Sequence, residues 1–160
     1  MDIVNSFELR VIFQIFLAAI LGGIVGIERE HAKKAAGTRT YALVSLGAAF
    51  FTIISRYGFK EFIDLQGFDP SRIASQVVVG VGFLGAGLII FRGLKVEGLT
   101  TAAGLWVAAA IGMAVGVEFY LIAVFASLFV FVIIAGMKAL NLEGWLERHL
   151  GRGAEEPKEK

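Results

Sequence analysis

The stretch DPSRIASQVVVGVGFLGAGLIIF, residues 69–91, decides the fold class of this 160-residue chain. Its later part is apolar for long enough to cross a bilayer, yet its opening turns carry Arg72, Ser75 and Gln76. Four glycines then follow within the apolar part: Gly80, Gly82, Gly85 and Gly87. Small and polar residues on two faces of one helix indicate helix neighbours on both sides. We therefore expect this stretch to be the central helix of a membrane bundle.

The ends of the same stretch allow two further interpretations. Asp69 suits an N-cap and Pro70 suits the first helical position, where the missing N–H is not needed. Residues 80–85 also match the GxGxxG pattern of dinucleotide-binding proteins. That pattern needs an acidic residue about 20 positions later, and Glu97 comes too early. Close helix packing in lipid is the better explanation of these glycines.

The composition excludes several classes of protein. Hydrophobic residues make up 57% of the chain and charged residues only 18%, which is typical of a membrane protein. A net charge of +1 argues against nucleic acid as a partner. Without cysteine the chain has no disulfide, thiol catalysis or zinc-thiolate site. The first apolar run is too long for a signal peptide, so we expect it to remain a membrane span.

Four other apolar runs accompany this stretch, at about residues 9–27, 40–55, 100–116 and 119–140. Together they predict an all-α membrane protein, a bundle of about five transmembrane helices with the lipid bilayer as its solvent. Small-residue stripes mark the expected packing faces: Gly22 and Gly26 in the first run, and Gly104, Gly112 and Gly116 in the fourth. We expect the small-residue stripe of the fourth run to pack against the third or the first run, and the fifth run to face lipid. For Gln14 a helix-to-helix hydrogen bond is favoured over a ligand site.

The remaining organisation follows from the tail and the basic residues. Residues 1–140 are expected to form the transmembrane domain, and residues 141–160 a cytoplasmic tail that begins with a short amphipathic helix and ends disordered. With the N-terminus outside, eleven Lys and Arg residues lie on the cytoplasmic side and four outside. This asymmetry predicts an N-out, C-in orientation.

Four segments in order are similar to the membrane domain of the MgtC/SapB family. They are GGIVGIERE at 22–30, GTRTYALVSLGAAFF at 37–51, DPSRIASQVVVGVGFLGAGLI at 69–89 and VEGLTTAAGLWVAAAIGMAVG at 96–116. The resemblance covers about residues 8–140 and implies a bacterial inner-membrane protein linked to magnesium limitation, acid stress or intracellular survival. It also implies a connection with regulation of the proton-translocating ATP synthase. Virulence-type members carry a soluble domain after the last span, and we expect this chain to be a short form without it.

Two groups of polar residues need an explanation. The inner group, expected near the cytoplasmic face, comprises Glu28, Arg29, Arg39, Glu97, Thr100 and Thr101, with Thr100 or Thr101 as a helix cap. It is interpreted either as a ligand or partner site or as a salt-bridge lattice between the first and third loops. The outer group comprises Asp69, Arg72 and Gln76. Asp69 is interpreted as a helix cap or as a weak contact for Mg²⁺. No other metal and no cofactor is expected.

No pairing of nucleophile and base can be recognised, so an enzyme is not expected. The favoured function is regulation or stress adaptation in the membrane, through association with another membrane protein or with a second copy, most simply as a two-fold dimer. The alternative is a small Mg²⁺ or proton-coupled transporter or channel. No carboxylate falls in the middle of a span, which disfavours the alternative.

Overall fold

A computed structural model describes residues 5–59, 61, 69 and 71–139, with side chains described as far as residue 136. The amphipathic helix expected at 141–150, the tail and the domain boundary therefore lie outside the described residues. Within them the chain forms five helices and one antiparallel hairpin: α1 (Ser6–His31), α2 (Thr38–Tyr57), α3 (Arg72–Ala86), β1 (Ile90–Arg92), β2 (Lys95–Glu97), α4 (Leu99–Gly116) and α5 (Tyr120–Ala139).

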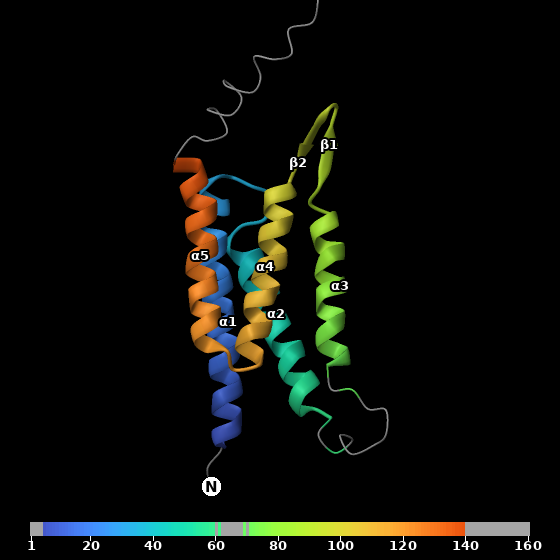
Figure 1. Ribbon diagram of the computed structural model, residues 1–160, viewed down its shortest axis with the longest axis vertical. Coiled ribbons are helices and arrows are strands. Elements are labelled where there is room, and N and C mark those ends of the chain that lie inside the picture. Colours follow the sequence, from blue (N-terminus) through green and yellow to red (C-terminus); the bar gives the residue numbers. More distant parts are fainter. Residues whose placement is uncertain (1–4, 60, 62–68, 70, 140–160) are drawn as a thin grey trace, which may run out of the picture.

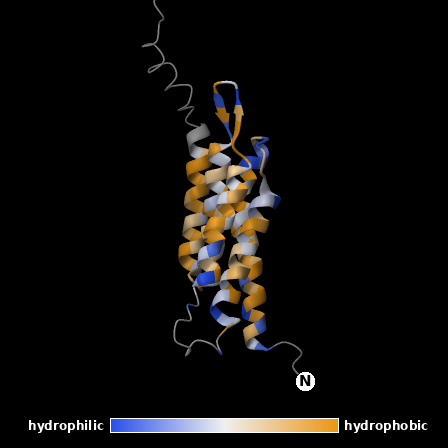
Figure 2. Cartoon of the chain, turned by 90° about the vertical axis from the view of Figure 1, so that its right-hand side faces the viewer, coloured by the Kyte–Doolittle hydropathy of each residue, from blue (hydrophilic) through white to orange (hydrophobic). Residues whose placement is uncertain are grey.

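The helices lie side by side, so the connections between them gather at two ends of the bundle (Figure 1). The α1–α2 connection and the β1–β2 hairpin share one end, which we call the hairpin end. The start of α1 and the α4–α5 connection share the other, which we call the distal end. Apolar residues cover most of the helical surface between the two ends (Figure 2). The all-α expectation is confirmed for the described residues, apart from the hairpin.

Three of the described helices, α1, α2 and α4, are long and apolar enough to cross a membrane. The apolar helix α3 is shorter, and α5 has described side chains only over Tyr120–Gly136, a stretch below the length of a crossing. A rise of 1.5 Å per residue makes α1 about 39 Å long and α3 only about 22 Å. The structure therefore supports three of the five expected crossings by length and composition.

The tightest packing joins α2 to both α1 and α4. A Cβ at Gly26 of α1 would lie 2.7 Å from the Thr38 backbone, and a Cβ at Gly116 of α4 would lie 2.9 Å from the Ala49 carbonyl. A Cβ at Gly112 would collide with the backbone of Ser45. Both glycine stripes thus pack as expected, but the partner of the fourth-run stripe is α2. The expectation that it packs against the third or first span is wrong.

Gln14 makes the helix-to-helix bond expected of it. Its Nε2 donates to the Val115 carbonyl at 2.9 Å and to the Gly116 carbonyl at 3.4 Å, and its side chain is fully buried. These carbonyls belong to the last turn of α4, where backbone acceptors lack intrahelical donors. Gln14 therefore ties α1 to the end of α4.

The helix α3 is peripheral, which corrects the expectation of a central helix. Val81 and Gly85 are its only buried residues, and they face α2 and α4. A Cβ built at Gly80 or Gly82 meets no described atom within 4 Å. These two glycines, on opposite sides of α3, were expected at helix contacts, but within the described chain neither has a neighbour. Gly85 packs as expected, since its Cβ would lie 3.6 Å from Ala102.

Both ends of α3 also differ from expectation. The helix begins at Arg72, and Asp69 accepts hydrogen bonds from the Ser71 N–H and hydroxyl at 2.8 and 2.7 Å, so it forms a turn before the helix rather than the cap. It ends at Ala86 because Gly87, which fills the C-cap position, is followed by β-branched and aromatic residues. The expected loop at 92–99 is a hairpin in which Phe91 pairs with Val96 and Gly93 supplies a positive φ of 62° at the turn.

We predict that Gly112→Ala destabilises the bundle, whereas Gly80→Ala does not. The added methyl group at Gly112 collides with the α2 backbone and should cost about 1–3 kcal/mol through overpacking. The same change at Gly80 meets open space and should gain up to about 1 kcal/mol in helix propensity. Melting in detergent, followed by circular dichroism, measures both. Equal melting temperatures for the parent and the Gly112 variant would refute this packing.

Candidate functional site

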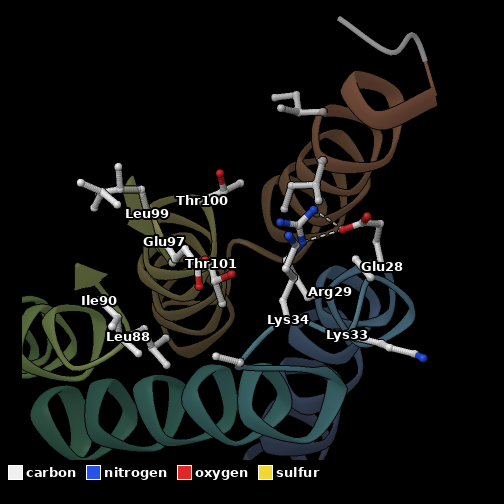
Figure 3. A pocket seen from close by; sticks show the side chains of 16 residues that line it. Glu28, Arg29, Lys33, Lys34, Leu88, Ile90, Glu97, Leu99, Thr100 and Thr101 are labelled. Carbon is white, nitrogen blue, oxygen red and sulfur yellow. Dashed lines mark hydrogen bonds and ion pairs between the residues drawn. The ribbon is translucent and has the colours of Figure 1, made fainter. Parts of the chain in front are cut away.

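A cavity of about 800 Å³ opens at the hairpin end. Residues from the end of α1, the following connection, the hairpin, the start of α4 and the end of α5 line it. Figure 3 shows Glu28 and Arg29 on one side and Thr100 and Thr101 on the other. Five segments far apart in sequence thus converge on one hollow, which makes it the leading site candidate.

The α1 side of the cavity holds a buried ion pair. Arg29 Nε donates to Glu28 Oε2 at 2.5 Å, and a second guanidinium nitrogen contacts the same oxygen. Glu28 is 8% exposed and Arg29 6%. A buried charge is costly unless it is paired, and the contact between Glu28 and Arg29 meets this requirement.

The chain leaves α1 through a turn that brings its lysines to the cavity. Lys33 has a φ of 51°, and the Lys34 N–H donates to the Arg29 carbonyl at 3.0 Å. A left-handed residue followed by such a bond is a common way to end a helix and reverse the chain. The Lys33 side chain points outward in Figure 3. Lys34 lines the cavity directly after the ion pair.

The α4 side begins at Gly98, where only glycine fits. Its φ is 93°, and an added Cβ would collide with the Leu88 carbonyl. Gly98 occupies the N-cap position and no side chain caps the helix, so the expected cap by Thr100 or Thr101 is wrong. These threonines are the second and third residues of α4, with hydroxyls beside the uncapped first turn.

Thr101 is nearly buried, at 3% exposed, and lines the cavity. Its carbonyl accepts a hydrogen bond from the Tyr41 hydroxyl at 2.9 Å, which fixes the first turn of α4 against α2. Among the described residues no hydrogen bond is made by its own hydroxyl. Its hydroxyl is not among the side-chain atoms that protein encloses completely, so it is open to the cavity that Thr101 lines.

The structure brings together most of the inner group expected from the sequence. Five of its members line the cavity: Glu28, Arg29, Glu97, Thr100 and Thr101. Arg39 does not line it. It is exposed near Glu30, whose carboxylate accepts the Thr38 N–H at 2.9 Å. At this end, ion pairs between described side chains join only residues close in sequence: Glu28 with Arg29, and Arg92 with Glu97 at 3.4 Å. These pairs do not form the expected salt-bridge lattice between the first and third loops.

The outer group is spread along the exposed start of α3. Asp69, Arg72 and Gln76 are all exposed, and hydrogen bonds from Ser71 hold the pKa of Asp69 below its ordinary value. Within the described part of the chain, no three His, Asp or Glu side chains are grouped closely enough to hold a metal ion. A weak Mg²⁺ contact at Asp69 stays a prediction.

A second polar cluster, at the distal end, was missed by the sequence reasoning. Glu118, in the α4–α5 connection, accepts a hydrogen bond from the Tyr57 hydroxyl at 2.5 Å. Arg56 lies 3.3 Å and Arg10 3.9 Å from the same carboxylate oxygen. The sequence did contain a signal for this cluster. Glu118 is a lone carboxylate between the fourth and fifth apolar runs, and it falls on the outer side, where Arg10 and Arg56 were also expected. The hydrogen bond from Tyr57, then the two arginines, hold the pKa of Glu118 below its ordinary 4.5.

We predict that Glu118 makes the bundle sensitive to acid. Because its pKa is lowered on folding, its contribution to stability is complete above about pH 4.5 and is lost as the pH falls further through the folded pKa. Glu118→Gln should lower the melting temperature at pH 7 and flatten its dependence on pH below 4.5. Glu8→Gln, at the exposed start of α1, is the control for a carboxylate outside the cluster. A Glu118 variant with the parent's pH dependence would contradict the prediction.

Comparison with known proteins places the chain in a family. It matches the MgtC family over residues 15–142. It is 47% identical over 125 residues to the protein named "Putative magnesium transporter YhiD" of Escherichia coli (strain K12), covering 77% of this chain and 58% of that protein. It is 35% identical over 146 residues to SrpB of Synechococcus elongatus, covering 85% of this chain and 79% of SrpB.

A third relative is MgtC of Brucella abortus (strain 2308), 40% identical over 123 residues, with 77% of this chain and 49% of that protein covered. The match thus spans about half the length of YhiD and of this MgtC. No solved structure gives a significant match. The family match covers most of the described helices, three of which can cross a membrane. The chain is therefore a membrane protein of the MgtC family.

Proposed function

We propose that this protein is a regulatory protein of the bacterial inner membrane, adapting the cell to magnesium limitation or acid stress. The observation that carries the proposal is the buried Glu28–Arg29 pair in the cavity wall. Burying two charges costs desolvation that a well-packed apolar pair would avoid. A pair kept beside a cavity is therefore better explained by ligand or partner recognition than by stability. The basic-residue asymmetry supports an N-out, C-in orientation, with the hairpin end in the cytoplasm.

Ion transport is the second candidate, supported by the printed name of the relative YhiD. The described helices give it less support. Their buried polar side chains away from the hairpin end are neutral: Gln14, Ser45, Thr52, Ser55 and Ser127. A cation pathway usually places an ionisable residue within the membrane. Ion flux into liposomes, measured against empty vesicles, separates transport from regulation.

Substitutions in the ion pair distinguish a working site from a structural lock. Glu28→Gln should abolish growth support at low magnesium or low pH, and should lower the melting temperature because the buried Arg29 charge loses its carboxylate partner, at about 3 kcal/mol. The double variant Glu28→Gln with Arg29→Gln removes both charges and should recover most of that stability. We predict that it stays inactive, because the recognition groups are gone.

Lys95→Gln, in the hairpin but outside the cavity lining, is the matched control and should support growth like the parent. Growth restored by the double variant would show that the pair is only a lock. Growth lost with Arg39→Ala in a folded protein would extend the site beyond the cavity.

We also propose that two copies associate through the exposed face of α3. Gln76, Gly80, Phe83 and Gly87 recur there at helical spacing and are all exposed, with Phe83 81% exposed. A polar amide and glycines on a lipid-facing surface favour a second helix, because close approach lets backbones pack and the amide find a partner. A two-fold dimer would cover both copies at once.

We predict that Gly80→Leu separates this dimer without unfolding the chain, because the added side chain meets open space in a single copy. Mass photometry or native mass spectrometry in mild detergent measures the change from two copies to one. Leu121→Phe, on exposed α5, is the control for added bulk elsewhere. A parent protein that is monomeric in these conditions would refute the association.

A further inference from the structure

We propose that the cavity at the hairpin end binds an anionic phosphate ester group, carried either by an acidic phospholipid or by a soluble phosphate ester. This inference rests on the proposed function and deepens it by naming the ligand chemistry of the same site. Three kinds of donor face the cavity: a guanidinium, a threonine hydroxyl and the start of a helix. A phosphate, with several acceptor oxygens, can use all three at once.

The helix contribution comes from α4. Its first N–H groups have no intrahelical acceptors, and no side chain caps them. The partial positive charge of a helix N-terminus favours anions at this position. Thr101 is 3% exposed and lines the same space, and its hydroxyl makes no hydrogen bond to a described residue. An unused hydroxyl, on a buried side chain and open to the cavity, is an observation independent of the helix that points to a ligand.

The α1 side supplies fixed positive charge. A guanidinium has five N–H donors, and the ion pair with Glu28 uses two nitrogens of Arg29 and leaves the third available. Because Glu28 holds the guanidinium in place, its remaining donors are already oriented. Lys34 adds a second cation at the rim. Arg29 is therefore a binding residue in this proposal, and Glu28 is a positioning residue.

A divalent cation fits the same cavity less well. Its two carboxylates are both engaged, Glu28 with Arg29 and Glu97 with Arg92. The other ionisable groups of the lining, Arg29, Lys33 and Lys34, are basic and would repel a cation. The electrostatics thus favour an anion.

The remaining lining residues described below are apolar, which indicates that the ligand has an apolar part beside its phosphate group. Leu88, Ile90, Leu99 and Ile133 belong to it, and the last three remain 49%, 55% and 43% exposed. Acyl chains would cover this surface, so the favoured source of the phosphate is a membrane lipid headgroup. A soluble phosphate ester has the same headgroup chemistry without the acyl chains.

The test uses the full chain in detergent, titrated with short-chain phosphatidylglycerol, short-chain phosphatidylcholine and glycerol 3-phosphate, with melting temperature as the readout. Phosphatidylglycerol should stabilise the protein saturably. Thr101→Val and Lys34→Gln should each weaken its apparent Kd about tenfold, as expected for one hydrogen bond or ion pair to a charged group. Thr40→Val and Lys95→Gln, exposed residues outside the lining, should leave the Kd unchanged.

Each result decides the proposal. Stabilisation by phosphatidylglycerol alone assigns a lipid, and equal affinity for glycerol 3-phosphate assigns a soluble ester. Equal stabilisation by phosphatidylcholine, no saturable binding, or no effect of the two lining variants overturns it. If Thr101→Val fails to fold, exposed Lys34→Gln carries the test. If a lining variant loses phosphatidylglycerol binding but still supports normal growth, only the proposed function is overturned. If a lining variant loses growth support but binds phosphatidylglycerol like the parent, only the proposed phosphate site is overturned.

Discussion

The close approach of α4 to α2 is the constraint on which the rest of the structure depends. A Cβ at Gly104 would lie 2.5 Å from the Tyr41 hydroxyl, and one at Gly112 would meet the Ser45 backbone. A side chain at position 104 would displace Tyr41 from α4, where its hydroxyl donates to the Thr101 carbonyl. Backbone contact of this kind is how helices associate in lipid, where the hydrophobic effect gives no drive to pack. The same contact fixes the position of the first turn of α4 along α2, and this turn forms one wall of the cavity.

The other wall depends on α1 in the same way. Gly26 lets α1 lie against the start of α2, and Glu30 accepts the Thr38 N–H across the short connection. The last turn of α1 therefore cannot rotate freely, and the Glu28–Arg29 pair is held where α4 begins. Both walls are fixed by glycine contacts deeper in the bundle. A site at the end of the helices can thus be rigid without a rigid loop.

The sequence predicted much of this and missed the rest for identifiable reasons. Glycine spacing identified the packing stripes, and polar residues at the ends of the apolar runs identified Glu28 and Arg29 as site candidates. Spacing does not say which helix a stripe meets, so the partner of the Gly104–Gly116 stripe was wrong. The glycines of α3 resemble those of α4 in sequence, but whether a glycine has a neighbour is decided by tertiary packing. Lys34 became a cavity residue only through the turn at Lys33, which local pattern did not reveal.

The distribution of charge connects these observations to function. Described buried charges occur only at the hairpin end, and the cluster of Arg10, Arg56 and the partly buried Glu118 lies at the distal end. The buried polar groups between them are neutral and mostly bond to backbone carbonyls. A transport path would need polar groups that can change partners along its length. Gln14, Thr52 and Ser127 are instead committed to the carbonyls of Val115, Ala48 and Leu21. Only Gln14 Oε1 and Ser45 Oγ are left without a partner among these described buried interior atoms. An interior of neutral, mostly committed polar groups with charged groups at its two ends suits a protein that binds at its surfaces, and it supports the proposal of regulation over that of conduction.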